Sequence, residues 1–284
     1  MRPVALVTDS TADLSLELRK KHGIYSIPLY VLFNDETYAD GVDLTTSELY
    51  QLVHEKNMIP RTAAVSPGDF LRFFEPIIEE GYDILYLGIG SSLSATFQSA
   101  RIAQSEPPPG RVTLVDSKNL SSGIGLLVLK AKDMRDQGMS AEAIKEKLEG
   151  LVPRVRSYFA IRTLDYLHKG GRASGTAKLI GGILKIKPII AVRDGQLEVY
   201  RKPAGKMSRA VDIMLDDFFA HEAIDTDYVM VTHSEAERHA RYAIDRIRSK
   251  RNIESIIESQ AGCVISSHCG PGTIGILYLL KEDA

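Results

Sequence analysis

The sequence predicts an α/β protein of two domains: a three-layer N-terminal domain with a mostly parallel sheet and a two-layer C-terminal domain with a mixed sheet. A length of 284 residues with 44% hydrophobic side chains suits one or two globular domains. The N-terminal half alternates short apolar runs with helical patterns, which is typical of a parallel sheet covered by helices on both faces. The second half adds a hairpin signal. We place the boundary near residue 155, which gives domains over residues 1–155 and 156–284.

The N-terminal half opens with a strand, a turn and a helix. Val4-Ala5-Leu6-Val7 is a short apolar run of the kind that parallel sheets bury, and a helical pattern follows over residues 14–21. Residues 26–33 form a second apolar run that contains Pro28, so an edge strand is expected there. Residues 43–48 then open a helix with the pattern of a capping box.

Two further strand-and-helix units complete this half. A helix is predicted over residues 69–80, before an apolar strand over residues 83–88. A Ser-rich turn and a helix ending near Ala103 come next, followed by a strand over residues 111–115 and a long helix over residues 121–137. Ligands of such sheets bind beyond the carboxyl ends of the strands, which is where the Ser-, Thr- and Asp-rich turns lie.

The second half carries the signals of a mixed sheet. Asp194-Gly195 separates two strand-like runs and predicts a hairpin. The Gly-rich apolar run over residues 179–184 is interpreted as core. Paired glycines are unfavourable inside a helix, so close approach of another backbone or an apolar ligand is expected to compensate there. The hairpin strands are expected over 187–192 and 196–200, other strands over 158–163, 228–233, 255–260 and 274–280, and amphipathic helices over 207–219 and 235–250.

Composition narrows the function classes. The formal net charge is -2 and the sequence pI is about 6.4, which argues against a nucleic-acid binder. We find neither an apolar run long enough to cross a membrane nor a signal peptide, so the cytoplasm is the expected location. The two cysteines, Cys263 and Cys269, exclude a disulfide framework and favour buried reduced thiols. His268 beside Cys269 is too sparse a set for a metal site, so neither a metal nor another cofactor is expected.

Several catalytic motifs are missing. The sequence has no phosphate loop, no HExxH and no GxSxG nucleophile elbow. Residues 270–275 match GxGxxG, but they precede a strand-like run and leave no room for the acidic residue that a dinucleotide site needs. We interpret this segment as a tight turn that holds His268 near a ligand or the domain interface. Asp9 and Asp13 are interpreted as turn and cap residues.

The most informative segment is Ser91-Ser92-Leu93-Ser94-Ala95-Thr96. It follows a predicted strand directly and carries four hydroxyls, although capping the next helix requires only one. Hydroxyls and the free N–H groups of a helix start together form a ready anion site. Thr62 lies in a loop of small residues, which by itself indicates only a turn. A functional role for Thr62 requires that it face the Ser94 turn.

One stretch of the sequence is strongly basic, although the net charge of the whole chain is negative. Residues 168–209 hold ten Lys and Arg and only two acids, a local formal charge of +8. Such a stretch is either a solvated face or a surface that meets phosphates or an acidic partner.

These features together resemble the DegV family of bacterial fatty-acid-binding proteins over essentially the whole chain. The order and spacing of the segments carry the resemblance, since each segment alone is weak. The matching segments are residues 7–13 (VTDSTAD), 38–43 (YADGVD), Thr62, 91–100 (SSLSATFQSA), 115–117 (VDS), 167–172 (LHKGGR) and 268–272 (HCGPG).

The resemblance implies a fatty acid held between the two domains of a DAK1/DegV-like fold. It implies that the hydroxyls of Thr62 and Ser94 bind the carboxylate, with Ser92, Ala95 and His268 near the head group. It further implies that a separate ATP-dependent fatty acid kinase subunit converts the bound acid to the acyl-phosphate used in phospholipid synthesis. Arg172 and Lys202 are then expected to face that partner. Long-chain acids such as palmitate, stearate or oleate are the expected ligands, and transient contact with a membrane surface is a further expectation.

The sequence departs from the family pattern at three positions. Ala95 stands where Gly is common, Ala63 where Ser is frequent, and Thr273 where Ala is common. None of these changes removes Thr62 or Ser94, so the carboxylate site is retained and no catalytic residue is expected. The alternatives are a serine-dependent hydrolase or acyltransferase using Ser94 with His268, and a nucleic-acid regulator using the basic stretch.

Overall fold

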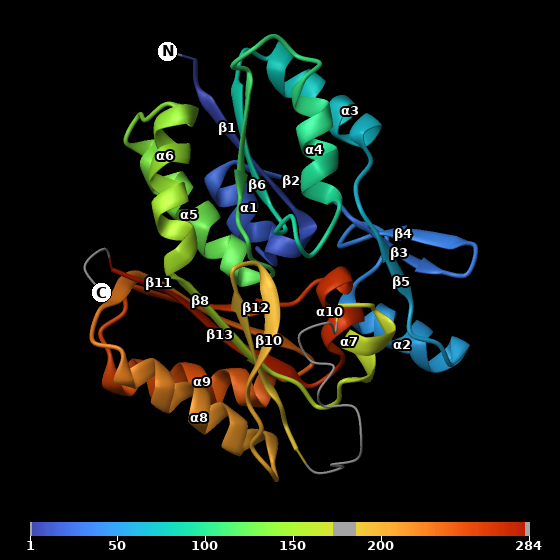
Figure 1. Cartoon of the computed structure of the whole chain (residues 1–284), viewed down its shortest axis with the longest axis vertical. Coiled ribbons are helices and arrows are strands. Elements are labelled where there is room, and N and C mark those ends of the chain that lie inside the picture. The colour runs from blue at the N-terminus through green and yellow to red at the C-terminus, as the bar shows by residue number, and fades with distance from the viewer. Residues whose placement is uncertain (1, 173–185, 282–284) are drawn as a thin grey trace.

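The computed structural model describes residues 2–172 and 186–281, and it confirms the predicted α/β fold class (Figure 1). The first sheet has the strand order β2-β1-β6-β7, and every pairing within it is parallel. Its strands are β1 (Val4–Asp9), β2 (Ile24–Ile27), β6 (Asp83–Gly88) and β7 (Val112–Asp116).

Helices cover both faces of this sheet, so the predicted three layers are present. Helices α3 and α4 pack on one face through a cluster that includes Phe70, Phe74 and Tyr86. Helices α1, α5 and α6 pack on the other face, around Leu6 and Leu85. The helix bounds are α1 Leu16–His22, α3 Pro67–Glu79, α4 Thr96–Gln104, α5 Ser122–Asp136 and α6 Ala141–Leu151.

The second sheet is mixed, as predicted. Its strand order is β10-β9-β8-β13-β11-β12; the β11–β12 pairing is parallel and the other pairings are antiparallel. Helices α8 (Met207–Ala220) and α9 (Glu237–Lys250) cover its outer face. The strands are β8 Val155–Ala160, β9 Ile189–Arg193, β10 Gln196–Arg201, β11 Ile224–Ser234, β12 Ser255–Gln260 and β13 Thr273–Leu280.

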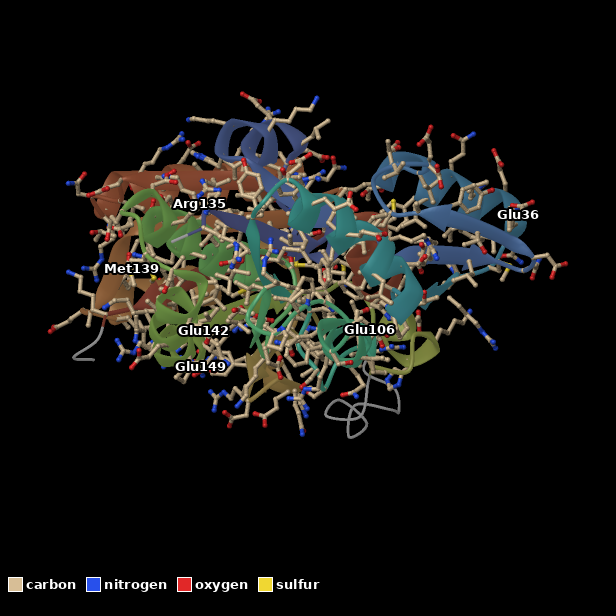
Figure 2. The ribbon with its side chains drawn as sticks, turned by 90° about the horizontal axis from the view of Figure 1, so that it is seen from above. Glu36, Glu106, Arg135, Met139, Glu142 and Glu149 are labelled. Atoms are coloured by element: carbon tan, nitrogen blue, oxygen red, sulfur yellow. The ribbon has the colours of Figure 1, made fainter. Side chains whose placement is uncertain are left out.

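Helix α5 lies between the two sheets and joins them into one body. Its buried residues run almost continuously from Ser122 to Ala131, as expected of a helix packed on all sides. The same apolar cluster contains Leu6 and Leu85 of the first sheet and Met230 of the second. At the end of the helix the Arg135 guanidinium donates to the His22 carbonyl at the end of α1 (Arg135 is labelled in Figure 2).

A small third sheet corrects one prediction. Residues 26–33 do not form a single strand, because the chain breaks at Pro28, which lacks a donor N–H. The first part ends the edge strand β2, and the second part is β3 (Tyr30–Phe33), the centre of the sheet β4-β3-β5. The outer strands are β4 (Glu36–Ala39) and β5 (Arg61–Ala63), and Glu36 marks the far tip of this hairpin in Figure 2.

Other boundaries differ only slightly from expectation. Helix α2 (Thr46–Lys56) begins with the predicted capping box, formed by Thr45 and Glu48. The Asp194-Gly195 hairpin is confirmed, whereas β8 begins three residues before the predicted strand start. The predicted run over residues 179–184 lies outside the described residues, and the boundary near residue 155 stays a prediction. Within the described ranges, no helix has the length and apolar character that a membrane crossing requires.

Candidate functional site

An apolar pocket lies where the inner face of the mixed sheet meets the turns that follow the parallel strands. It encloses about 260 Å³, and most of its surface is contributed by apolar atoms. Its walls come from the turns after β5, β6 and β7, from strands β8, β11 and β13, and from helix α10 (Cys263–Cys269). The apolar lining consists of Leu29, Ile89, Leu93, Leu120, Phe159, Leu167, Leu197, Val264, Ile265 and Leu277.

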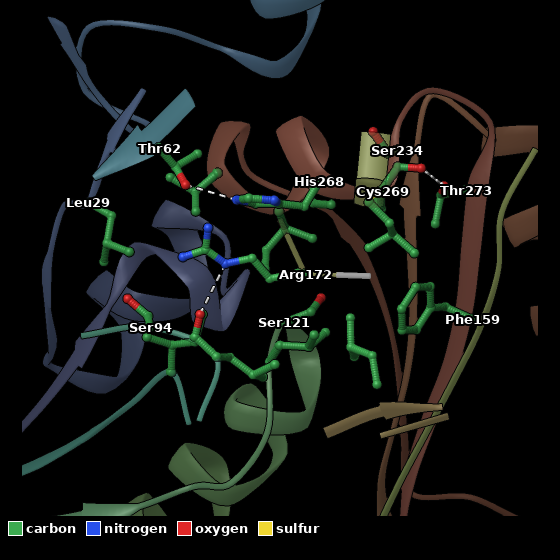
Figure 3. Close-up of a pocket in the computed structure, with 18 of the residues that line it drawn as sticks. Leu29, Thr62, Ser94, Ser121, Phe159, Arg172, Ser234, His268, Cys269 and Thr273 are labelled. Carbon is green, nitrogen blue, oxygen red and sulfur yellow. Dashed lines mark hydrogen bonds between the residues drawn. The ribbon is translucent and has the colours of Figure 1, made fainter. Parts of the chain in front are cut away.

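Two predicted hydroxyl residues, Thr62 and Ser94, both line this pocket. Thr62 lies on β5 opposite Val31, so the register of a short strand, rather than a turn, directs it inward. Ser94 lies in the turn after β6, and its Oγ accepts from the backbone N–H of Thr96 at 3.2 Å. Figure 3 shows the two hydroxyls on either side of the Arg172 guanidinium. The structure therefore places Thr62 and the Ser94 turn on the same pocket.

His268, on α10, lies beside Thr62. Its Nε2 is 2.8 Å from Thr62 Oγ1, and its Nδ1 is buried with no hydrogen-bond partner in the described part of the chain. Burial, assisted by the positive charge of Arg172, lowers the pKa of His268 to about 4. The imidazole is therefore neutral near pH 7 and carries one N–H, and the ring tautomer decides whether Nε2 or the Thr62 hydroxyl donates in this contact.

This neutral histidine has a testable consequence for stability. The folded pKa of about 4 lies below the ordinary histidine pKa of 6.5, so the unfolded chain gains this proton as the pH falls from 6.5 to 4 and the folded chain does not. The free energy of unfolding should therefore fall over that window, by up to roughly 3 kcal/mol from this group. His268→Gln should remove this part of the pH dependence. Urea unfolding of both proteins at several pH values checks it; parallel profiles would contradict the assignment.

Arg172 lies at the pocket rather than only on an outer surface. It lines the cavity, its Nε donates to the Leu93 carbonyl at 3.3 Å, and its Nη1 donates to the Gly170 carbonyl at 2.8 Å. These bonds fix the guanidinium between Thr62 and Ser94 in Figure 3. Lys202, the other expected partner-facing residue, is exposed just beyond β10 and does not line the pocket.

The two remaining head-group residues occupy different places. Ala95 lines the pocket and precedes α4, where its side chain makes no cap. The Ser92 Oγ instead donates to the Gly195 carbonyl at 2.7 Å, which ties the Ser-rich turn to the β9–β10 hairpin. Ser92 therefore braces the turn, and Ser94 is the serine of this segment that lines the apolar pocket.

Buried carboxylates anchor the helix that carries His268, and sequence reasoning missed this role. Asp13 accepts from the Gly262 N–H at 2.8 Å and from the Ser121 hydroxyl, and Asp40 accepts from the Cys263 N–H at 2.7 Å. Burial raises the pKa of both carboxyls. These bonds hold the start of α10. No local sequence pattern predicts them, because the carboxylates and the start of α10 are more than 200 positions apart.

Asp9 shapes the turn after β6. As predicted, it caps the following turn by accepting from the Thr11 N–H at 3.0 Å. It also accepts from the Ile89 N–H at 2.8 Å and from the Tyr86 hydroxyl at 2.9 Å. The Asp9 carboxyl, with these three donors and the Thr11 hydroxyl as a fourth, fixes the chain where the Ser-rich segment begins.

The described residues do not assemble a metal site. No group of three or more His, Cys, Asp and Glu side chains within them is placed to hold an ion. Both cysteines are buried free thiols, and burial raises the pKa of Cys269 to about 12. The predicted tight turn is present, with Gly270 and Gly272 at positive φ between α10 and β13.

A family model described as an uncharacterised protein of the DegV family matches residues 3–281. A DegV domain-containing protein of Caldanaerobacter subterraneus is 36% identical over 98% of this chain and 99% of its own length.

Solved structures agree with the family model. A DegV family protein from Thermus thermophilus, described for its fatty acid binding, has a TM-score of 0.92 at 35% identity, covering 99% of this chain and 100% of its own. The Streptococcus pneumoniae fatty acid kinase B3 protein loaded with linoleic acid shares the fold at 22% identity, with a TM-score of 0.84 over 98% of this chain and 100% of its own. With its fold and nearly its whole length matched, this chain belongs to the DegV family.

Proposed function

We propose that this protein binds a long-chain fatty acid in the apolar pocket, with the carboxylate held by the hydroxyls of Thr62 and Ser94. The observation that carries the proposal is that both hydroxyls line a cavity whose surface is mostly apolar. Fatty acid binding by the Thermus thermophilus relative supports it. Palmitate, stearate and oleate are the ligands we propose, with no further cofactor.

The hydroxyls orient the acid, and the chain provides the affinity. Each buried methylene contributes about 0.8 kcal/mol, so a chain of about fourteen methylenes outweighs any single polar contact. When His268 Nε2 donates to Thr62 Oγ1, the Thr62 proton is free to point at the carboxylate. The neutral histidine thus sets the direction of the Thr62 hydrogen bond without adding a charge.

Direct titration tests this proposal. Protein freed of lipid is titrated with palmitate, stearate and oleate in separate calorimetric runs, with octanoate as the short-chain comparison. Saturable binding of one long-chain acid per protein, with much weaker binding of octanoate, is the expected result. A protein that binds none of the three long-chain acids would contradict the proposal.

We further propose that the protein is a carrier without catalysis of its own, acting in the cytoplasm for an ATP-dependent kinase subunit. The partner transfers the terminal phosphoryl group of ATP to a carboxylate oxygen, forming an O–P bond and releasing ADP. The family resemblance supports this role. The resulting acyl-phosphate is proposed to serve phospholipid synthesis, and transient contact with a membrane surface would accompany delivery.

Lys202 gives a test of the kinase surface, because it is exposed and does not line the pocket. Lys202→Ala should leave fatty acid affinity unchanged and reduce phosphorylation of the bound acid by about fivefold, since a charge at the rim mainly affects association. Lys20→Ala, at an exposed lysine of α1, is the matched control. Initial rates with the kinase subunit measure both. Equal rates for Lys202→Ala and the native protein would contradict this docking surface.

The hydrolase or acyltransferase alternative requires Ser94 to be activated by His268. In the structure Ser94 Oγ is 2.9 Å from Thr96 Oγ1, whereas His268 Nε2 contacts Thr62. A triad also needs an acid to orient the histidine, and Nδ1 has no such partner among the described residues. These contacts support the carrier. Labelling of Ser94 by a fluorophosphonate would favour the enzyme instead.

A further inference from the structure

A basic cavity lies on the side of the mixed sheet that helices α8 and α9 cover. It has a volume of about 830 Å³ and shares no lining residue with the apolar pocket. Its walls come from the chain after β8, the segment before β9, the starts of α8 and α9, and the turn before β13. Four cationic side chains line it, and each comes from a different one of these segments: Arg162, Lys187, Lys206 and Arg238.

The four cations of this basic cavity are not neutralised by acids. Within residues 2–172 and 186–281, none of them forms a salt bridge with a carboxylate, and Glu235 is the one acidic residue that lines the cavity. The Lys187 ammonium donates to the Arg162 carbonyl at 3.2 Å, which positions its charge without cancelling it. Burial and the charge of Arg238 lower the pKa of His239, so this histidine stays neutral near pH 7.

Two helices begin at the same cavity. Helices α8 and α9 pack side by side on the mixed sheet, and Met207 and Ser208 of α8 line the cavity together with Arg238 and His239 of α9 (Figure 1). No side chain caps the start of either helix. The first backbone N–H groups of a helix have no partner within it and carry partial positive charge. The helix starts therefore add hydrogen-bond donors to the charges of the four cations.

The turn after α10 gives Arg162 its place at the cavity. Gly272 has a φ of +78°, and its N–H donates to the Ser234 carbonyl at 2.6 Å. A Cβ atom at Gly272 would clash with Cδ of Arg162, so the arginine stem lies directly on the glycine. The sequence analysis interpreted this segment only as a tight turn; in the structure it also makes room for one of the four cations.

An anion that carries phosphate groups matches these donors. Guanidinium and ammonium groups bind phosphate oxygens through charge-assisted hydrogen bonds, and uncapped helix starts bind them through backbone N–H groups. A small dissolved anion can enter a recess and reach the helix starts, whereas the flat surface of a bilayer cannot. Lys187 and Lys206 belong to the basic stretch over residues 168–209, and their position favours phosphate contact over a merely solvated face.

We propose that the basic cavity is a binding site for a dissolved anion with linked phosphate groups, in addition to the lipid site. The anion would sit against the starts of α8 and α9, with the four cations around it. This inference does not depend on the proposed function, because the two cavities have no lining residue in common.

Two variants test the site with inorganic pyrophosphate as the probe. Lys206→Gln removes one exposed cation, and Ser208→Asp places a carboxylate at the start of α8, where a negative charge favours the helix. Lys20→Gln, at an exposed lysine of α1, is the matched control because all three variants change the net charge equally. Each protein is titrated calorimetrically in magnesium-free buffer of low ionic strength, and urea unfolding checks its stability.

The native protein and Lys20→Gln should bind pyrophosphate saturably and with equal affinity. Lys206→Gln should bind it about tenfold more weakly, and Ser208→Asp more weakly still, although its stability should be unchanged or higher. Vesicles of phosphatidylcholine and phosphatidic acid in equal parts, used in co-sedimentation, should retain the native protein no better than Ser208→Asp. The proposal is overturned by equal affinities in all four proteins, by no saturable binding of pyrophosphate, or by vesicle retention that only Ser208→Asp loses.

Discussion

Replacing Thr62 by valine and Ser94 by alanine together is expected to weaken palmitate binding by about a hundredfold or more. Hydrogen bonds to a charged group contribute roughly 1.5–3 kcal/mol each, and about 1.4 kcal/mol corresponds to a tenfold change in affinity. Valine keeps the shape of threonine, and Ser94, which accepts from the Thr96 N–H, lies in a turn that Asp9 also holds. The loss should therefore reflect missing hydroxyls rather than a collapsed pocket. Calorimetric titration of the lipid-free proteins measures it.

Two controls separate the contribution of the hydroxyl–carboxylate hydrogen bonds to affinity from the contribution of apolar burial. Thr62→Ser retains the hydroxyl and should retain most of the affinity. Methyl palmitate has no carboxylate, so the double variant and the native protein should bind it with similar affinity. If the double variant binds palmitate as tightly as the native protein, the carboxylate lies elsewhere and the site assignment is wrong.

Replacing Asp13 by alanine is expected to lower the free energy of unfolding by about 3 kcal/mol. The substitution leaves the Gly262 N–H and the Ser121 hydroxyl without their shared acceptor in a buried place. Unsatisfied buried polar groups cost about 1–3 kcal/mol each. Because Gly262 begins the helix that carries His268, fatty acid affinity should fall as well. Urea unfolding of the lipid-free protein measures the stability change.

Asp13→Asn is the matched variant for this prediction. It retains one carbonyl oxygen as an acceptor and removes the charge whose burial raises the pKa of Asp13. Its loss of stability should therefore be clearly smaller than that of Asp13→Ala. Equal stability of Asp13→Ala and the native protein would show that this anchor does not hold α10.

Much of the fold follows from local patterns. The apolar runs of the parallel strands and the Asp194-Gly195 turn predict their elements because burial and turn geometry act over a few residues. Pro28 was interpreted within a single strand, but it separates two strands that belong to different sheets. Strand β5 was missed, since three residues show no alternation; only its pairing with β3 reveals it.

The candidate site was partly accessible from sequence. The Ser-rich turn could be predicted as a binding site because it carries more hydroxyls than a helix cap requires. Ser94 of this turn does line the pocket. That Thr62 meets His268 could not be predicted from spacing, because 206 residues separate them. The position of Arg172 likewise depends on a carbonyl in the turn at Leu93. Such contacts arise only when the two sheets pack together.

The central claim is that the apolar pocket holds a long-chain fatty acid. The most direct measurement is mass spectrometry of the native protein, purified without detergent, before and after extraction with organic solvent. The account predicts a complex heavier than the bare chain by one fatty acid, with the same acid recovered in the extract. A protein at its bare mass that also gains no thermal stability from added palmitate, stearate or oleate would contradict it.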